Sequence, residues 1–290
     1  MKEEKYINPF SDFGFKKLFG EEANKDLLID FLNSLLYEEH KIIDLTFKKN
    51  DQLGSTELDR KAIFDLYCID EKGQRFIVEL QKAEQKFFKD RTVYYSTFPI
   101  QEQARKGDWN YKLEPVYCIG ILDFAFEEDN KYPNKYFYRV GLSDLETNKL
   151  FYNKLFYIYI EVPKFKKVES ELSNNREKWI YFLKNLSRLD EIPDKLKNDM
   201  FIRAFKIAEI SNFTEEQKFA YEESMKYYRD LKNVIDKSYD DGKIEGEEIG
   251  IEKGEIKKAE EMAKKMKSKN EPINKIIEYT ELTKEEIEKL

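Results

Sequence analysis

Residues 62–81 read AIFDLYCIDEKGQRFIVELQ, the segment with the strongest strand and turn signals in the chain. Two runs rich in β-branched and aromatic residues flank a polar segment that contains Gly73, a residue suited to the positive φ of a tight turn. The pattern predicts a β-hairpin that folds about Lys72. In that register Asp65 lies opposite Glu79, or within one residue of it if the loop contains a bulge, and their Cβ atoms are about 4.5–5.5 Å apart. Both carboxylates then point the same way.

The two faces of the predicted hairpin differ. Side chains alternate along a strand, so one face is apolar throughout and is expected in the core. Its members are Phe64, Leu66, Cys68, Phe76, Val78 and Leu80. The other face carries Asp65 and Glu79 among large apolar side chains, so we expect it to be covered. Two adjacent carboxylates there require a shared proton, a basic partner or a divalent cation. We favour the cation over a solvated face whose acids pair with lysines.

At these residues the chain resembles the PD-(D/E)XK nuclease superfamily. The superfamily motif is an acid on one strand and (D/E)-x-K on the next, which stands here as Asp65 and then Glu79-Leu80-Gln81. The similarity is to the recombination-promoting nuclease or putative transposase branch, in which Gln often replaces the lysine. It covers roughly residues 6–190 and a weaker helical tail. Further positions match that branch: Asn8-Pro9-Phe10, Asp12, Phe15-Lys16, Phe19, residues 27–33, Arg91, Tyr94-Tyr95, Gln103, Gly107, Pro115-Val116, residues 122–124, Pro163-Lys164-Phe165, Trp179 and Phe182-Leu183.

The resemblance implies a restriction-endonuclease-like fold, with a mixed central sheet flanked by helices. It also implies metal-assisted hydrolysis of phosphodiester bonds in DNA, linked to recombination or transposition. Asp65, Glu79 and the backbone carbonyl of Leu80 would hold Mg²⁺ or Mn²⁺, and Gln81 would position the attacking water. A neutral amide offers hydrogen bonds without the charge of the motif lysine. We therefore expect slow turnover or a second cationic group.

Four further residues are weaker candidates for the site. Asp12 lies where a helix is expected to begin, and we favour its role as a helix-start acid over that of an additional metal-site acid. On a helix expected over residues 83–106, Arg91, Tyr95 and Gln103 recur near every fourth residue and so lie near one stripe. The resemblance implies that they line the cleft. A surface ion pair for Arg91 and core packing for Tyr95 are equally weighted alternatives.

Composition indicates a soluble, cytoplasmic protein. The 290 residues are 41% apolar, enough for one substantial core and an appendage. No apolar run approaches the roughly 18 residues of a membrane helix, and residues 1–10 contain no hydrophobic signal core. Cys68 and Cys118 fall within apolar runs and are expected as buried free thiols. His40 is the one histidine and is expected to face solvent, which excludes a His-rich zinc site and offers no Ser/His/Asp triad.

The net charge of −7 is the strongest argument against DNA as a partner. Affinity for DNA comes mostly from phosphate neutralisation, so a globally acidic protein must gather its basic residues on one surface. Basic residues that flank the proposed site in the sequence are Lys16, Lys17, Lys48, Lys49, Lys82, Lys86, Lys89, Arg91, Arg105 and Lys106. We expect modest DNA affinity that falls with salt.

Periodicity along the chain predicts an α/β or α+β domain. Helices are expected near 11–19, near 24–36 and from 175 onward, and strands near 42–48, 115–124 and 154–162, with a less certain strand near 136–140. We predict one nuclease-like domain over residues 1–238, in which residues 175–238 form capping helices.

Residues 239–290 differ in character, because charged residues dominate and glycine recurs at every fourth position. The glycines are Gly242, Gly246, Gly250 and Gly254. On a helix they form a nearly straight stripe that permits close approach by another helix, although each costs about 1 kcal/mol of helix stability relative to alanine. The segment is either a frayed helical linker or, through residues 240–290, a means of self-association.

The chain beyond residue 270 predicts two short helices joined by a turn, because Thr283 and Glu286 form a capping box. We interpret it as a protein-contact module. A metal-dependent DNA endonuclease is the favoured function. One alternative is a nuclease fold that binds DNA or protein without cutting, with Gln81 marking lost catalysis. The other is an assembly or regulatory protein that acts through residues 240–290.

Overall fold

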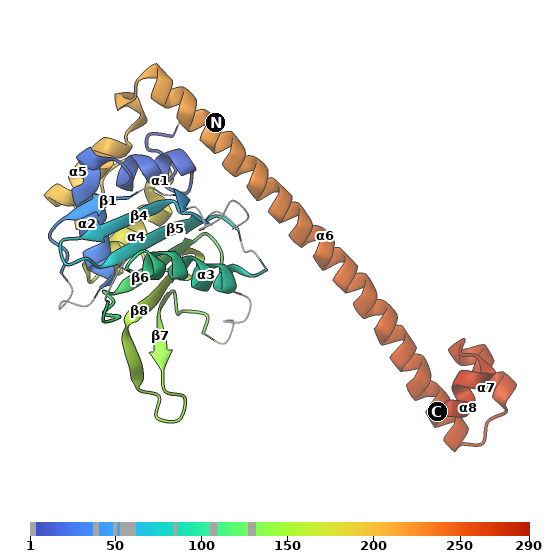
Figure 1. The fold of residues 1–290 in the computed structure, drawn as a ribbon. Coiled ribbons are helices and arrows are strands. Elements are labelled where there is room, and N and C mark those ends of the chain that lie inside the picture. Colours follow the sequence, from blue (N-terminus) through green and yellow to red (C-terminus); the bar gives the residue numbers. More distant parts are fainter. Residues whose placement is uncertain are drawn as a thin grey trace. The chain divides into compact units, whose positions relative to one another are not determined.

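A six-stranded mixed sheet is the centre of the computed structural model (Figure 1), which describes residues 4–36, 41–48, 51–52, 62–83, 86–104, 109–126 and 132–290. The strands lie in the order β1-β4-β5-β6-β8-β7. Their bounds are β1 Leu45–Phe47, β4 Leu66–Asp70, β5 Arg75–Gln81, β6 Val116–Leu122, β7 Phe137–Ser143 and β8 Leu150–Glu161. Strands β5, β6 and β8 run parallel, and the other neighbours pair antiparallel. Two short strands, β2 (Asp51–Gln52) and β3 (Ala62–Ile63), pair separately.

The predicted hairpin is confirmed as β4 and β5. Leu66 pairs with Val78, a register that places Asp65 opposite Glu79. Gly73 has a φ of 82°, as the turn requires. The expectation for Phe64 is wrong, because this side chain packs on the other face of the sheet. Residues 64 and 65 lie between β3 and β4, with a bend at Asp65, so the alternation of an extended strand does not continue through them.

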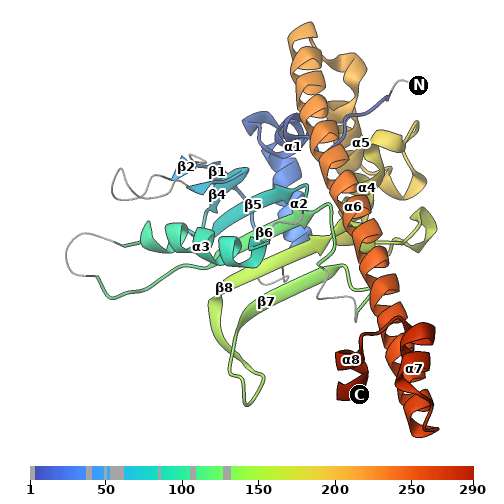
Figure 2. The same ribbon diagram turned by 90° about the vertical axis from the view of Figure 1, so that its right-hand side faces the viewer.

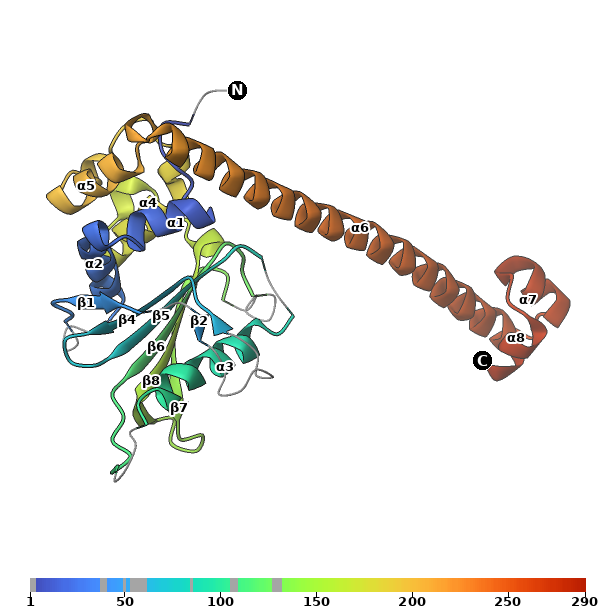
Figure 3. The same cartoon turned by 45° about the horizontal axis from the view of Figure 1, so that its top comes forward.

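Helices cover both faces of the sheet, and each face has its own core. Four helices pack on one face with Leu66, Cys68, Phe76 and Val78 (Figure 3). They are α1 Asp12–Phe19, α2 Lys25–Leu35, α4 Asn175–Asn185 and α5 Asp199–Ala208. Helix α3 (Phe88–Gln101) covers the opposite face, where Phe88 packs with Tyr67 and Ile77. The face that carries the two acids is therefore covered, as the sequence predicts.

Short 3-10 helices connect several of these elements: η1 Glu22–Asn24, η4 Val162–Lys164, η5 Glu169–Glu171, η6 Leu186–Arg188, η7 Asp194–Leu196 and η8 Ile210–Asn212. Strands β7 and β8 form a long hairpin at one edge of the sheet (Figure 2). The helix expected over residues 83–106 is shorter than predicted and ends two residues after Pro99, which has no N–H to bond the preceding turn.

Both cysteines are buried free thiols, as expected, and burial raises the pKa of each. None of the helices in the described part of the chain is long and apolar enough to span a membrane.

The chain divides into two compact units, Met1–Asp230 and Leu231–Leu290. Helix α6 (Glu215–Ser268) begins in the first unit and continues through the predicted domain boundary at residues 238–239. The second unit also contains α7 (Ile273–Thr280) and α8 (Lys284–Lys289). Its small core includes Ala263, Ile276 and Ile287. The predicted capping box of Thr283 and Glu286 is present at the start of α8.

Glu177 fixes the segment that leads into α4. The backbone N–H and the hydroxyl of Ser173 each donate to Glu177 Oε2 at 2.9 Å, and the ammonium of Lys167 donates to Oε1. Burial alone would raise the pKa of Glu177, but these hydrogen bonds outweigh it and lower the pKa to about 2.

Because the folded-state pKa lies below the unfolded value near 4.5, Glu177 stabilises the protein above pH 4.5, and this contribution disappears as the pH falls toward 2. We expect Glu177→Gln to lower the free energy of unfolding by about 1–3 kcal/mol at pH 7 and by less at pH 3. Urea denaturation at both pH values measures the difference, with the exposed Glu146→Gln as the control. An equal loss at pH 7 and pH 3 would contradict this role.

Candidate active site

Asp65 and Glu79 lie together near the carboxyl end of β5. Asp65 immediately precedes β4, and its N–H donates to Glu79 Oε1 at 3.3 Å. The N–H of Leu80 donates in turn to Asp65 Oδ2 at 2.6 Å. Each carboxylate therefore bonds to the backbone of the other residue's strand, which fixes the pair in the predicted register. Glu79 is only 8% exposed, so this face is not the solvated surface of the alternative interpretation.

Two ionised carboxylates are unfavourable in this environment. Burial and the nearby charge of Asp65 raise the pKa of Glu79 to about 8. Burial also raises the pKa of Asp65, and the charge of Asp12 adds to the increase, against the hydrogen bond from Leu80 and the charges of Lys16 and Lys82. The pair retains a proton near neutral pH unless a positive charge is bound beside it.

The donor set fits a hard divalent cation. Carboxylate and backbone carbonyl oxygens are the ligands that Mg²⁺ and Mn²⁺ prefer, and the buried pair supplies two carboxylates in fixed positions. Among the residues that the structure describes, no group of three or more Asp, Glu, His or Cys side chains is arranged to hold a metal. A cation held by Asp65 and Glu79 would therefore need backbone or water oxygens as further ligands.

Gln81 and Arg91 meet beside the acidic pair. Arg91 extends from α3 and donates from Nη2 to Gln81 Oε1 at 2.5 Å, while Gln81 Nε2 donates to the carbonyl of Ala83 at 2.8 Å. The guanidinium lies 5.1 Å from the ring centroid of Phe88 and 5.6 Å from that of Tyr95. Burial raises the pKa of Tyr95, and the charge of Glu79 adds to that effect. The structure thus brings Gln81, Arg91 and Tyr95 to the same place as the acids.

Helix α1 approaches the pair from the other face of the sheet. Asp12 is its first residue, Ser11 caps the helix by accepting from the Gly14 N–H at 3.0 Å, and Asp12 forms an ion pair with Lys16 at 3.0 Å. The charges of both Asp12 and Lys16 act on Asp65. Asp12 is therefore a helix-start acid close to the candidate site, and a role as a metal ligand stays a prediction.

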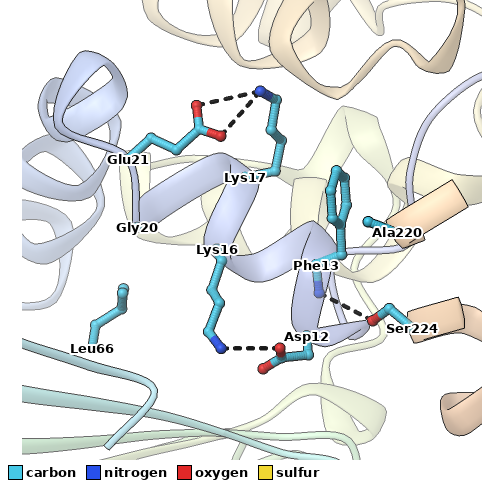
Figure 4. Close-up of a pocket in the computed structure, with 9 residues that line it drawn as sticks. All are labelled: Asp12, Phe13, Lys16, Lys17, Gly20, Glu21, Leu66, Ala220 and Ser224. Carbon is cyan, nitrogen blue, oxygen red and sulfur yellow. Dashed lines mark hydrogen bonds and ion pairs between the residues drawn. The ribbon is translucent and has the colours of Figure 1, made fainter. Parts of the chain in front are cut away.

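A hollow of about 380 Å³ adjoins α1 (Figure 4). It is lined by Asp12, Phe13, Lys16, Lys17, Gly20, Glu21, Leu66, Ala220 and Ser224. The hydroxyl of Ser224 on α6 accepts from the N–H of Phe13 at 3.1 Å, and Lys17 pairs with Glu21 at 3.0 Å. The first turns of α6 thus form one wall of this hollow.

A family model for the PD-(D/E)XK nuclease family transposase matches residues 9–238. The chain belongs to this family. Neither the comparison with curated proteins nor that with solved structures gives a match. The family accounts for the mixed sheet with helices on both faces, and it supports a function related to nuclease or transposase activity.

The hydrogen bonds of Gln103 are with residues outside the candidate site. Its carbonyl accepts from the N–H of Glu114 at 2.7 Å, and its amide donates to the carbonyls of Pro99 and Glu114 at 3.1 and 3.2 Å. Helical spacing predicts Gln103 near the stripe of Arg91, but the two residues are 12 positions apart, about 18 Å along a helix axis, and Gln103 lies beyond the end of α3. A shared stripe specifies a direction and not a position.

Asp123 lies beside Gln81, although the sequence motif does not predict it as a site residue. The Asp123 N–H donates to the Gln81 carbonyl at 2.9 Å, and the hydroxyl of Tyr228 on α6 donates to Asp123 Oδ2 at 2.8 Å. The available signal was a polar residue directly after the wholly apolar strand β6. Several predicted positions lie outside the described residues: His40, Lys49, Arg105, Lys106 and Gly107.

The acidic pair predicts an unusual dependence of stability on pH. The folded-state pKa of Glu79, about 8, lies above the unfolded value near 4.5, so its contribution is complete below pH 4.5 and is lost as the pH rises through 8. In EDTA, we expect the free energy of unfolding to fall in this range by up to about 1.4 kcal/mol per pH unit. We also expect Glu79→Gln to remove most of the decrease, and Ca²⁺ to restore stability at pH 8.5.

Urea denaturation of the wild type and of Glu79→Gln, at pH 5 and pH 8.5, measures this effect. Asp90→Asn, an exposed acid on α3, is the control for a general change in charge. If the difference in the free energy of unfolding between wild type and Glu79→Gln does not change with pH, the two carboxylates do not repel each other in the folded protein.

Proposed function

We propose that this chain is a cytoplasmic, Mg²⁺- or Mn²⁺-dependent DNA endonuclease that hydrolyses phosphodiester bonds in recombination or transposition. The observation that carries the proposal is the buried pair of Asp65 and Glu79, in which Glu79 accepts from the N–H of Asp65 and Asp65 accepts from the N–H of Leu80. Burial of two adjacent carboxylates raises the free energy of the folded protein, and a bound divalent cation would offset this increase.

Each residue of the site has a proposed role. Asp65, Glu79 and the carbonyl of Leu80 would hold the cation. A bound cation would acidify the attacking water and offset charge on the phosphate. Gln81 orients the water through an amide N–H, and Tyr95 supports Arg91 through its ring. Asp12 contributes negative charge near Asp65 as an accessory acid.

The local charge at the site is less acidic than the net charge of −7 suggests. Lys16 and Lys82 act on Asp65 from one side, and Arg91 acts on Glu79 from the other. A bound divalent cation adds two positive charges. This distribution supports DNA as the partner, with an affinity that decreases as salt screens the few phosphate contacts.

Nicking of supercoiled plasmid tests the proposal. We expect wild-type protein to nick in Mg²⁺ or Mn²⁺ and not in EDTA. Asp65→Asn and Glu79→Gln should each lower the rate by about 1,000-fold or more, because groups that act as a unit fail together. Asp90→Asn, with the same change in charge at an exposed position, should nick at the wild-type rate. Circular dichroism of each variant tests whether it is folded.

The neutral side chain of Gln81 favours a second candidate, a nuclease fold that binds DNA or protein without cutting it. This candidate replaces the first if folded wild-type protein binds plasmid, single-stranded DNA or RNA but cuts none of them in Mg²⁺, Mn²⁺ or Ca²⁺. Binding in Ca²⁺, measured by fluorescence anisotropy, separates a protein that cannot cut from one that does not engage nucleic acid.

We also propose that the chain self-associates through residues 240–290, as an assembly function separate from cleavage. Ile249 and Ile256 are 42% and 49% exposed on α6 and lie seven residues apart, so they share a face. Four glycines of α6 each have space for a Cβ with no heavy atom within 4 Å: Gly242, Gly246, Gly250 and Gly254. An exposed helix with apolar and small residues on its surface is suited to a second helix.

Sedimentation velocity of the full chain tests this association. We expect an oligomer for the wild type and a monomer for the double variant Ile249→Glu/Ile256→Glu, because a buried carboxylate opposes helix pairing. Ile251→Glu is the matched control, since Ile251 is also exposed but lies on the other side of α6. A monomeric wild type, or the same loss from Ile251→Glu, would rule out this interface.

A further inference from the structure

The proposed endonuclease lacks a cationic side chain at the third motif position, where Gln81 replaces the lysine. An amide cannot stabilise developing negative charge as strongly as an ammonium group. The side chain that contacts Gln81 is Arg91, which comes from a different element of the fold. We propose that Arg91 supplies the positive charge that Gln81 lacks, and that Gln81 holds the guanidinium beside the scissile phosphate. The inference rests on the proposed nuclease function.

The geometry of Gln81 suits this holding role. Its Nε2 donates to the Ala83 carbonyl at 2.8 Å, which directs Oε1 toward Arg91 Nη2 at 2.5 Å. An amide oxygen accepts a hydrogen bond from a guanidinium without neutralising its charge, whereas a carboxylate would neutralise it. A lysine at position 81 has no acceptor and would repel Arg91. Glutamine at position 81 therefore fixes Arg91 without placing a further negative charge beside it.

Two aromatic rings restrict the guanidinium further. The Arg91 carbon Cζ lies 5.1 Å from the ring centroid of Phe88 and 5.6 Å from that of Tyr95, within the range of cation–π attraction. Phe88 is itself buried in the core beneath α3. Arg91 also lies close enough to Glu79 for its charge to act on that carboxylate. The cation is thus placed at the acidic pair by contacts from both its own helix and β5.

The chemistry of the guanidinium matches the reaction. During hydrolysis the water oxygen forms a bond to phosphorus as the bond to the leaving oxygen breaks. The water loses a proton, the leaving oxygen gains one, and negative charge is redistributed over the phosphoryl oxygens. Arg91 acts by hydrogen bonding and charge and transfers no proton in this step. Its planar fork of five N–H donors can bind Gln81 and a phosphoryl oxygen together, which a lysine ammonium does with less directional control.

Variants of the full chain test this assignment by single-turnover plasmid nicking and by calorimetric titration with Mn²⁺ without DNA. We expect Arg91→Gln to lower the nicking rate by about 100- to 1,000-fold. Its Mn²⁺ affinity should be unchanged or higher, because a cation near the metal has been removed. Arg91→Lys should keep more activity than Arg91→Gln. Lys206→Gln, which removes one positive charge from an exposed side chain of α5, should nick at the wild-type rate.

A charge relocation gives the sharpest test. Gln81→Lys places a second cation beside Arg91 and should lower activity. The double variant Gln81→Lys/Arg91→Gln moves the charge to the motif lysine position, and we expect it to nick at least about tenfold faster than Arg91→Gln. The double variant therefore tests whether a positive charge at position 81 can replace the positive charge of Arg91 in cleavage.

Two results would overturn the inference while leaving the nuclease intact. One is an Arg91→Gln variant that nicks within about threefold of wild type. The other is a parallel loss of nicking and Mn²⁺ affinity in Arg91→Gln with no recovery in the double variant, which is the signature of a structural role. Folded wild-type protein that cuts no substrate in any metal would instead overturn the proposed function, and this inference with it.

Discussion

The repulsion between Asp65 and Glu79 is the constraint on which the rest of the site depends. The β4–β5 register sets the two residues opposite each other, and covering helices remove the water that would otherwise separate their charges. Each carboxylate accepts a backbone N–H from the other strand, so neither side chain turns away to relieve the repulsion. A cation or a retained proton is the remaining compensation. The same contacts that raise the electrostatic cost also fix the positions of the carboxylate oxygens.

The surrounding elements bring charge to this pair from both faces of the sheet. Helix α3 supplies Arg91 from one side, and α1 supplies Asp12 and Lys16 from the other. Asp123 lies beside Gln81 because β5 and β6 pair in parallel, which aligns the carboxyl ends of the two strands. The alternating signs keep the net charge near the site small. A globally acidic chain therefore remains compatible with a phosphate-containing substrate, because only the local field acts on it.

The surroundings of helix α6 differ between its first turns and the part beyond Leu231. Its first turns belong to the N-terminal unit, where Ser224 bonds to the start of α1 and Tyr228 bonds to Asp123. Beyond Leu231 the same helix exposes apolar residues and glycines with open space around them. Packing stabilises the first part, whereas the second part depends on its own backbone bonds and on whatever pairs with it. The division explains why its sequence changes from aromatic-rich to charged without a break in the helix.

The sequence by itself determined the hairpin, the pairing of Asp65 with Glu79, the covered acidic face, and the capping box of α8, because each follows from local periodicity or turn chemistry. It also indicated the family through the order of short motifs. Tertiary structure decided what local periodicity does not encode. Phe64 lies on the other face because a bend precedes β4. Gln103 bonds to the backbone of Pro99 and Glu114, and a shared helical stripe, which fixes a direction and not a position, does not predict this. The bond between Arg91 and Gln81 joins residues of different elements, so only the packing of α3 on the sheet establishes it.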